Sequence, residues 1–202
     1  MISFKNKKVI VFDLDGTIVK LPVDWGHLKG LLTKRYNDVY DEKCEFIHIS
    51  ACLDYIVDKN DEAELQNFFN ILEEYEMMSI KDNKGIEETI FFINNQIEFD
   101  VSKEIKLAIL SLNTRRAIKE SLILAGIDKK IDFIVGREDV RKWKPNPEGL
   151  FKVRDHFNVE EKDMMYIVDL EKDVITGKNA GIEAYLIDEL INLVNKRREK
   201  IT

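Results

Sequence analysis

Residues 9–17, which read VIVFDLDGT, decide the fold of this chain. The first four are β-branched or aromatic, which is typical of a strand that is buried on both of its faces. The apolar run stops at Asp13, and Gly16 permits a backbone turn that bulkier residues resist. A strand of this kind belongs in a parallel sheet that helices cover on either side.

After Gly85, alternating helical and strand-like patterns support the same prediction of a parallel sheet covered by helices. Isoleucines spaced three or four residues apart between Ile86 and Ile97 predict a helix. Apolar runs at residues 107–112, 133–135, 164–168 and 183–187 predict strands, with helices between them and a last helix from Glu189 onward. This alternation predicts the α/β class, with a doubly wound, Rossmann-like parallel sheet.

Residues 20–83 hold no comparable strand and are predicted to be helical. Leucines at helical spacing begin at Leu28 and again at Leu65. Asp61 with Glu64 resembles a capping box that opens the second of these helices. We therefore expect an α/β core made of residues 1–18 and 85–202, with a small helical cap, residues 19–84, inserted after the first strand.

The composition limits the classes of function. Of the 202 residues, 45% are apolar and 34% are charged, as in soluble globular domains. The net charge of −7, without a long basic stretch, argues against nucleic-acid binding. The longest apolar stretch, residues 122–127, is far shorter than the roughly 18 residues of a membrane span, and residues 1–8 carry no signal-peptide core. We expect a cytoplasmic protein with no membrane or nucleic-acid partner.

Two cysteines, Cys44 and Cys52, lie in the predicted helical insertion. Two thiols do not make a disulfide framework, and their spacing matches no metal motif. Because cysteine packs as a small apolar residue, we expect both to be buried free thiols.

Two carboxylates directly follow the first strand. Right-handed crossovers bring the carboxyl ends of parallel strands to one edge of the sheet, where ligands bind. Asp13 and Asp15 flank Leu14, whose side chain points away, so the two carboxylates can share one space. Their repulsion favours a shared proton or a bound cation. One carboxylate could then act as a nucleophile while the other holds a proton.

Polar residues follow the later strands as well. Ser111 and Asn113 end the strand at residues 107–112 and can hydrogen-bond phosphoryl oxygens without adding charge. Lys144 follows the third strand, and a fixed ammonium can neutralise both a nucleophile and a transferring phosphoryl group. Asp169 ends the fourth strand and Asp173 comes one helical turn later. Such oxygen ligands suit Mg²⁺.

With these residues the sequence resembles the haloacid dehalogenase-like superfamily of phosphohydrolases. Four motifs occur in the family's order and span nearly the whole chain: FDLDGT at 12–17, SLN at 111–113, KP at 144–145, and aspartates 169 and 173 before NAG at 179–181. The helical insertion resembles the cap of phosphoglycolate phosphatase-like members. The resemblance implies a Mg²⁺-dependent phosphatase that acts on a small phosphorylated metabolite through an aspartyl-phosphate.

The resemblance also implies a role for each residue. Asp13 would attack phosphorus, and Asp15 would protonate the leaving oxygen and then activate water. Ser111, with Asn113, would bind the phosphoryl group that Lys144 neutralises.

A Mg²⁺ site is implied by the same resemblance, formed by Asp13, the backbone carbonyl of Asp15, Asp169 and Asp173. Family members often have Gly before this metal-binding aspartate and Ser or Thr after it, whereas this chain has Val168 and Leu170. Both departures keep the ligand itself and remove flexibility and a polar group from its loop.

Other functions stay open as alternatives. A phosphomutase of the same superfamily would share these residues, and product analysis with a sugar phosphate would separate the two. A dehalogenase would need neither a metal nor an acid at Asp15. A phospho-accepting receiver would take phosphate at a later strand and would lack the long insertion. A non-catalytic phospho-ligand binding module would have little reason to keep Asp15.

A few further residues have expected roles outside the chemistry. Trp143 is expected to pack in the core, and His48 is expected to be an ordinary helix residue. Trp25 and His27 are expected to have structural roles, with contact to the substrate as the alternative. Arg115 or Arg116, which open the helix after Asn113, offer an alternative contact for a substrate anion.

Overall fold

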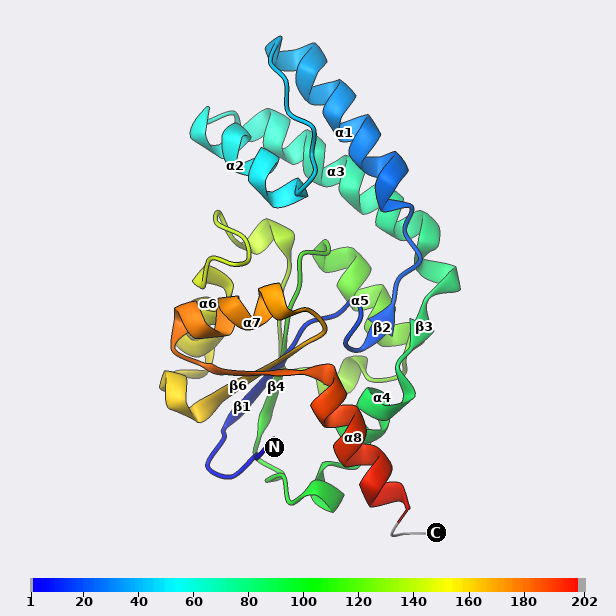
Figure 1. Cartoon of the computed structure of the whole chain (residues 1–202), viewed down its shortest axis with the longest axis vertical. Coiled ribbons are helices and arrows are strands. Elements are labelled where there is room, and N and C mark those ends of the chain that lie inside the picture. The colour runs from blue at the N-terminus through cyan, green and yellow to red at the C-terminus, as the bar shows by residue number, and fades with distance from the viewer. Residues whose placement is uncertain (1, 200–202) are drawn as a thin grey trace.

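A computed structural model describes residues 2–199 as a parallel sheet with helices on both faces and a further helical layer beyond one edge (Figure 1). Five strands pair in the order β5-β4-β1-β6-β7, and every pair in this sheet is parallel. They are β1 (Val9–Phe12), β4 (Lys106–Leu110), β5 (Phe133–Val135), β6 (Met164–Val168) and β7 (Glu183–Leu186). The predicted doubly wound α/β class is confirmed.

Side chains alternate across the central strand β1 and enter two different hydrophobic cores. Val9 and Val11 belong to one core, and Ile10 and Phe12 belong to the other. The helices α6 (Glu148–Phe157) and α7 (Glu171–Ala180) cover the first core. The helices α4 (Glu87–Asn94), α5 (Arg115–Leu124) and α8 (Ile187–Arg198) cover the second. Burial on both faces fixes the position at which β1 ends and Asp13 begins.

Three helices form the insertion between β1 and the rest of the sheet. They are α1 (Trp25–Tyr40), α2 (Ile49–Asp58) and α3 (Glu62–Ser79). The Asp61 carboxylate accepts a hydrogen bond from the backbone N–H of Glu64, so the predicted N-cap of α3 is present. The other half of the capping box is not formed, because the Glu64 side chain pairs with Arg35 of α1 instead.

A short antiparallel ribbon joins the insertion to the sheet. Its strands are β2 (Val19–Lys20) and β3 (Lys84–Gly85), so the chain leaves and returns at adjacent points. The helix that follows ends earlier than its isoleucine pattern predicts. Ile97 lies beyond α4 in a turn of 3₁₀-helix and is 63% exposed, because the chain turns before that side chain can reach the core.

The insertion packs on the same hydrophobic core as α6 and α7. Its buried residues, among them Leu28 and Leu72, form one continuous cluster with Val9 and Val11. Trp143, from the loop after β5, is 3% exposed and meets the ring of Phe69 edge to face at 6.3 Å. This confirms the packing role of Trp143.

The prediction of free thiols is wrong, because Cys44 and Cys52 form a disulfide. Their Cα atoms are 6.3 Å apart, within the range that a disulfide spans. Cys44 lies in the turn after α1, and Cys52 lies in the first turn of α2. The turn folds back on the helix and brings the two sulfurs together, which sequence spacing does not reveal.

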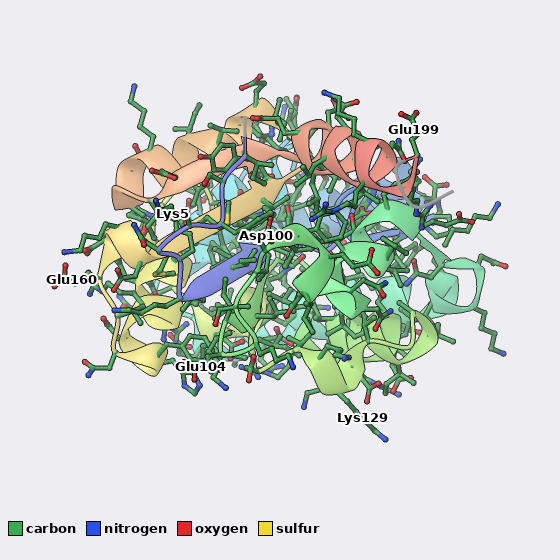
Figure 2. All side chains as sticks on the ribbon, turned by 90° about the horizontal axis from the view of Figure 1, so that it is seen from below. Lys5, Asp100, Glu104, Lys129, Glu160 and Glu199 are labelled. Carbon is green, nitrogen blue, oxygen red and sulfur yellow. A yellow bond between two sulfur atoms is a disulfide. The ribbon has the colours of Figure 1, made fainter. Side chains whose placement is uncertain are left out.

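The end of the molecule opposite the insertion carries exposed side chains of both signs, such as Lys5, Asp100 and Lys129 (Figure 2). Mixed charges of this kind are typical of a solvated surface. Within residues 2–199, no helix combines the length and the apolar character that crossing a bilayer requires.

Candidate active site

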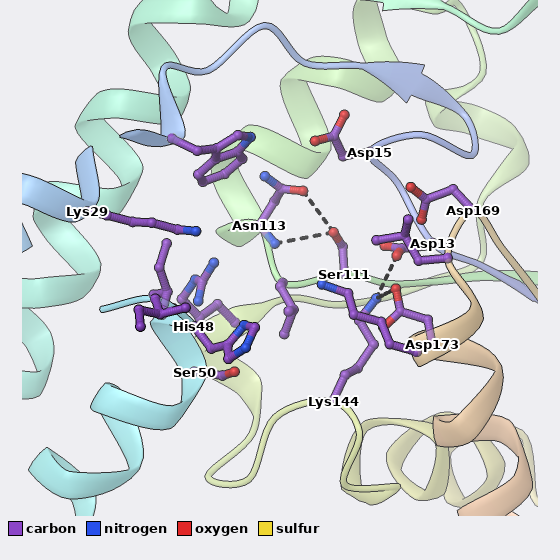
Figure 3. A pocket seen from close by; sticks show the side chains of 17 residues that line it. Asp13, Asp15, Lys29, His48, Ser50, Ser111, Asn113, Lys144, Asp169 and Asp173 are labelled. Atoms are coloured by element: carbon purple, nitrogen blue, oxygen red, sulfur yellow. Dashed lines mark hydrogen bonds and ion pairs between the residues drawn. The ribbon is translucent and has the colours of Figure 1, made fainter. Parts of the chain in front are cut away.

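The residues expected after the strands all line one cavity of about 340 Å³ between the sheet edge and the insertion (Figure 3). Asp13 directly follows β1, Ser111 directly follows β4, and Asp169 directly follows β6. Lys144 reaches the same cavity from the loop between β5 and α6, and Asp173 from the first turn of α7. The structure thus brings together every site residue that the sequence suggested, Asp15 and Asn113 included.

Asp13 forms the centre of the site and is held in a defined orientation. Its Oδ1 accepts a hydrogen bond of 2.7 Å from the backbone N–H of Leu14, and its Oδ2 accepts one of 2.6 Å from Lys144 Nζ. Lys144 Nζ also lies 3.4 Å from Asp173 Oδ2. Burial alone would lower the pKa of Lys144, but the charges of Asp13, Tyr166 and Asp173 raise it, so the side chain stays an ammonium.

Asp15 stands apart from that ion pair. Its Oδ1 accepts a hydrogen bond of 2.9 Å from the backbone N–H of Leu21, which fixes the carboxylate at the cavity wall. Burial raises the pKa of Asp15, the charge of Asp13 raises it further, and the Leu21 hydrogen bond opposes the increase. The two carboxylates therefore differ: Asp13 is paired with Lys144, whereas Asp15, with its raised pKa, is the better proton carrier.

Ser111 and Asn113 form a small hydrogen-bonded loop at the cavity floor. Ser111 Oγ donates to Asn113 Oδ1 at 2.9 Å, and the backbone N–H of Asn113 donates to Ser111 Oγ at 3.2 Å. Glu76 of α3 accepts from Asn113 Nδ2 at 3.1 Å, and from the N–H and hydroxyl of Thr114 at 2.8 and 2.6 Å. The insertion thus contacts the loop that carries Ser111 through one buried carboxylate.

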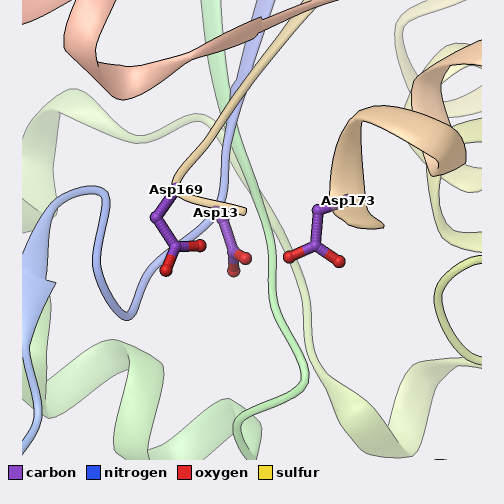
Figure 4. Close-up of side chains that lie close together, drawn as sticks. All are labelled: Asp13, Asp169 and Asp173. Atoms are coloured by element: carbon purple, nitrogen blue, oxygen red, sulfur yellow. The ribbon is translucent and has the colours of Figure 1, made fainter. Parts of the chain in front are cut away.

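Three carboxylates can approach a single cation (Figure 4). Asp13, Asp169 and Asp173 each offer an oxygen, and these oxygens lie within 4.8 Å of one another. Burial raises the pKa of Asp169 to about 6, and the charge of Asp13 adds to the effect. Clustered, partly buried carboxylates of this type fit a hard divalent cation. The departures at Val168 and Leu170 leave the Asp169 carboxylate in this cluster.

Gly16 allows the turn after Asp15 to lie against Asp169. Its φ of +78° is in the left-handed region, and a Cβ at this position would lie 2.3 Å from Asp169 Oδ2. The glycine therefore serves two needs, a backbone conformation and the space that Asp169 occupies.

Some residues of the cavity have no signal in the sequence. Lys29 and Trp25 line it from α1, and His48 and Ser50 line it from the start of α2. Trp25 and His48, for which structural roles were expected, therefore also line the cavity. Distance along the chain hides these residues, because α1 and α2 reach the cavity only through the folding of the insertion.

The arginines that open α5 do not reach the cavity. Arg115 pairs with Asp139 at 2.5 Å, and Arg116 pairs with Glu73 at 3.2 Å. A different arginine, Arg137 after β5, lines the cavity in their place.

Comparison with known sequences identifies a family that this chain matches. The sequence profile of haloacid dehalogenase-like hydrolases matches residues 10–187. The chain is 30% identical over 108 residues to pyrophosphatase PpaX of Halalkalibacterium halodurans, covering 54% of this chain and 47% of that protein. It is 31% identical over 104 residues to a phosphorylated carbohydrates phosphatase of Thermotoga maritima, covering 52% and 45%. The chain thus spans about half the length of these two relatives.

A longer match has lower identity. The chain is 26% identical over 187 residues to phosphoglycolate phosphatase of Aquifex aeolicus, covering 89% of this chain and 84% of that protein. A solved structure of a HAD-superfamily hydrolase from Geobacter sulfurreducens superposes with a TM-score of 0.56 at 17% identity, covering 94% and 97% of the two chains. This structural likeness supports the fold. The chain therefore belongs to the family of haloacid dehalogenase-like hydrolases.

Proposed function

We propose that this chain is a Mg²⁺-dependent phosphatase that hydrolyses a small phosphate monoester through an aspartyl-phosphate on Asp13. The observation that carries the proposal is the pairing of Asp13 with Lys144 at 2.6 Å, beside a second carboxylate, Asp15, with a raised pKa. This arrangement offers a nucleophile paired with an ammonium and a proton carrier in one cavity. The phosphatases among its relatives support the assignment.

In the first half-reaction, an oxygen of Asp13 attacks phosphorus and the ester oxygen leaves. Asp15 gives its proton to that oxygen, so the alcohol departs neutral. Lys144, with the Ser111 hydroxyl and the Asn113 amide, stabilises the charge on the transferring phosphoryl group.

In the second half-reaction, Asp15 takes a proton from water, and the oxygen of that water attacks the phosphorus of the aspartyl-phosphate. The bond from phosphorus to Asp13 breaks, which releases inorganic phosphate and restores the carboxylate of Asp13 and the protonated Asp15. Asp15 therefore acts first as an acid and then as a base.

The acidic cluster fits Mg²⁺, which prefers oxygen ligands and takes few carboxylates. Asp13, Asp169 and Asp173, with the backbone carbonyl of Asp15, would hold the ion. When bound, it would offset the charge of the carboxylates and of the phosphoryl oxygens. The helices α1 to α3 would act as a cap that excludes water from the cavity.

The test is phosphate release from a panel of small phosphate esters, with Mg²⁺ and with EDTA. The wild type should release phosphate only with the metal, and Asp13→Asn should release none. Asp100→Asn, a nearly fully exposed aspartate at the opposite end of the molecule (Figure 2), is the matched control and should behave as wild type. A folded protein that binds Mg²⁺ and cleaves no ester would overturn the proposal, and an isomerised sugar phosphate would identify a mutase.

A further inference from the structure

Arg137 is a buried cation, and two of its side-chain donors have no protein partner in the described part of the chain. The residue is 2% exposed, and its Nε and Nη1 are buried without a hydrogen-bond partner among the described residues. A buried charged group that lacks hydrogen bonds is costly and calls for an explanation.

The backbone around Arg137 holds this side chain in place. Its N–H donates to the carbonyl of Asn113 at 2.9 Å, and its carbonyl accepts from Trp143 Nε1 at 2.9 Å. Both partners are themselves buried. The guanidinium is therefore presented from a fixed position, and it lines the cavity that contains Asp13 and Lys144.

Glu76 balances part of this charge without occupying the donors. The carboxylate oxygens of Glu76 accept hydrogen bonds from Asn113 and Thr114, and none from Arg137. Burial lowers the pKa of Arg137, and the negative charge of Glu76 opposes that decrease. The guanidinium thus keeps its charge, and its Nε and Nη1 are buried at the cavity wall without a partner among the described residues.

A second cation reaches the cavity from the insertion. Lys29 extends from α1 into the cavity, although it is far in sequence from Ser111 and Lys144 (Figure 3). In the part of the chain that the structure describes, neither Lys29 nor Arg137 takes part in an ion pair with an acidic side chain. The remaining charges of the cavity are the four aspartates, Lys144, and Lys172 from the first turn of α7.

We propose that Arg137 and Lys29 form a second anion-binding subsite, which selects phosphate esters that carry another acidic group. This inference rests on the proposed phosphatase function. A planar guanidinium with free donors suits the two oxygens of a carboxylate or a phosphoryl group. A cavity of about 340 Å³ is at the small end of ligand sites, which suits a compact metabolite that carries both anions.

Three substrates on one two-carbon skeleton test the subsite. They are 2-phosphoglycolate, ethane-1,2-diol bisphosphate and 2-hydroxyethyl phosphate, which carry a second carboxylate, a second phosphoryl group and neither. The wild type should show a kcat/KM at least about tenfold higher for one of the charged esters, the value of one charge-assisted hydrogen bond. The better of the two identifies which anion the subsite takes.

Arg137→Gln should reduce this preference at least about tenfold, mainly through KM, and Lys29→Gln should reduce it less. Arg137→Lys should restore part of the preference, because lysine returns the positive charge but not the planar, paired donors of the guanidinium. Arg116→Gln is the matched control, since Arg116 pairs with Glu73 outside the cavity, and it should keep the wild-type ratio. Equal kcat/KM for all three esters, or an equal loss for all three in Arg137→Gln, would overturn the proposal.

A binding measurement separates failure of the subsite from failure of the phosphatase assignment. Calorimetry with 3-phosphonopropionate and 3-hydroxypropylphosphonate compares a second anion with a neutral group in ligands that cannot be hydrolysed. Tighter binding of the first, lost in Arg137→Gln and in Lys29→Gln, supports the subsite even if no ester is cleaved. Lys29→Gln keeps the test available if Arg137→Gln does not fold, and equal binding of the two ligands by wild type contradicts the subsite.

Discussion

Replacement of Gly16 by alanine should disable the site without unfolding the protein. Gly16 has a φ of +78°, and a Cβ there would lie 2.3 Å from Asp169 Oδ2 and 2.6 Å from Asp169 Cγ. The carboxylate must therefore move. Gly126, with a φ of +70° and no atom within 4 Å of the position of a Cβ, offers the same substitution in open space.

The backbone part of the cost is common to both variants. An alanine in the left-handed region costs about 1–2 kcal/mol, and the reduced entropy of the unfolded chain returns about 0.4–1 kcal/mol. Gly16→Ala and Gly126→Ala should therefore each lose about 1 kcal/mol of unfolding free energy in urea titrations.

The functional part belongs to Gly16→Ala alone. To restore an ordinary contact, Asp169 Oδ2 must retreat by about 1.1 Å, the difference between 3.4 and 2.3 Å. A misplacement of about 1 Å in a catalytic arrangement can cost about 100-fold, and Mg²⁺ tolerates little change in ligand distance. We expect kcat/KM for the best ester to fall about 100-fold, or about 2.7 kcal/mol.

The assay is Mg²⁺-dependent phosphate release at saturating metal, alongside calorimetric titration of Mg²⁺ into each variant. Gly126→Ala should keep wild-type activity and metal affinity. If Gly16→Ala matched Gly126→Ala in both measurements, the inference that Asp169 needs the space beside Gly16 would be refuted.

Three other predictions concern the insertion and the acidic cluster. Glu76→Gln should lower stability by about 2 kcal/mol and reduce kcat, because an amide has one acceptor oxygen and cannot accept from both Thr114 and Asn113. Unchanged urea and kinetic curves would contradict this. Loss of the disulfide in the double variant Cys44→Ser, Cys52→Ser should lower stability by about 2.5 kcal/mol, as expected for a loop closed over a separation of 8 residues. Urea titration of the oxidised, reduced and variant proteins measures this loss, and equal midpoints would contradict it. Because the folded pKa of Asp169 is raised to about 6, above its unfolded value, its contribution to stability is full below about pH 4 and is lost as the pH rises through 6. Without metal, the melting temperature of the wild type should therefore fall relative to Asp169→Asn between about pH 4 and 7, whereas parallel curves would argue against it.

The fold was predictable because its decisive signals are local. The run at β1 is apolar on both faces, and all four of its residues are fully buried. Once the strands alternate with helices, the topology alone places Asp13, Ser111 and Asp169 at one edge, whatever their distance in sequence. The positions of the motif residues could therefore be predicted from the ends of the strands.

The rest of the site depends on packing between distant segments. Glu76 lies in the acidic run EEYE at residues 73–76, which looks like a solvated helix face. It is buried only because α3 crosses the loop at Asn113 and Thr114. Lys29 likewise reaches the cavity only because α1 packs over the sheet edge. The disulfide was missed for the same reason, since the turn that joins Cys44 to Cys52 is a tertiary feature.

The two-stranded ribbon below the insertion has an evolutionary consequence. Because β2 and β3 pair side by side, the chain enters and leaves the insertion through one narrow stem. The register of β1 against β4 and β6 is fixed outside that stem. The segment between can lengthen, shorten or be exchanged without displacing Asp13. A change confined to that single segment can therefore reshape what lies over the cavity while Asp13 keeps its place at the end of β1.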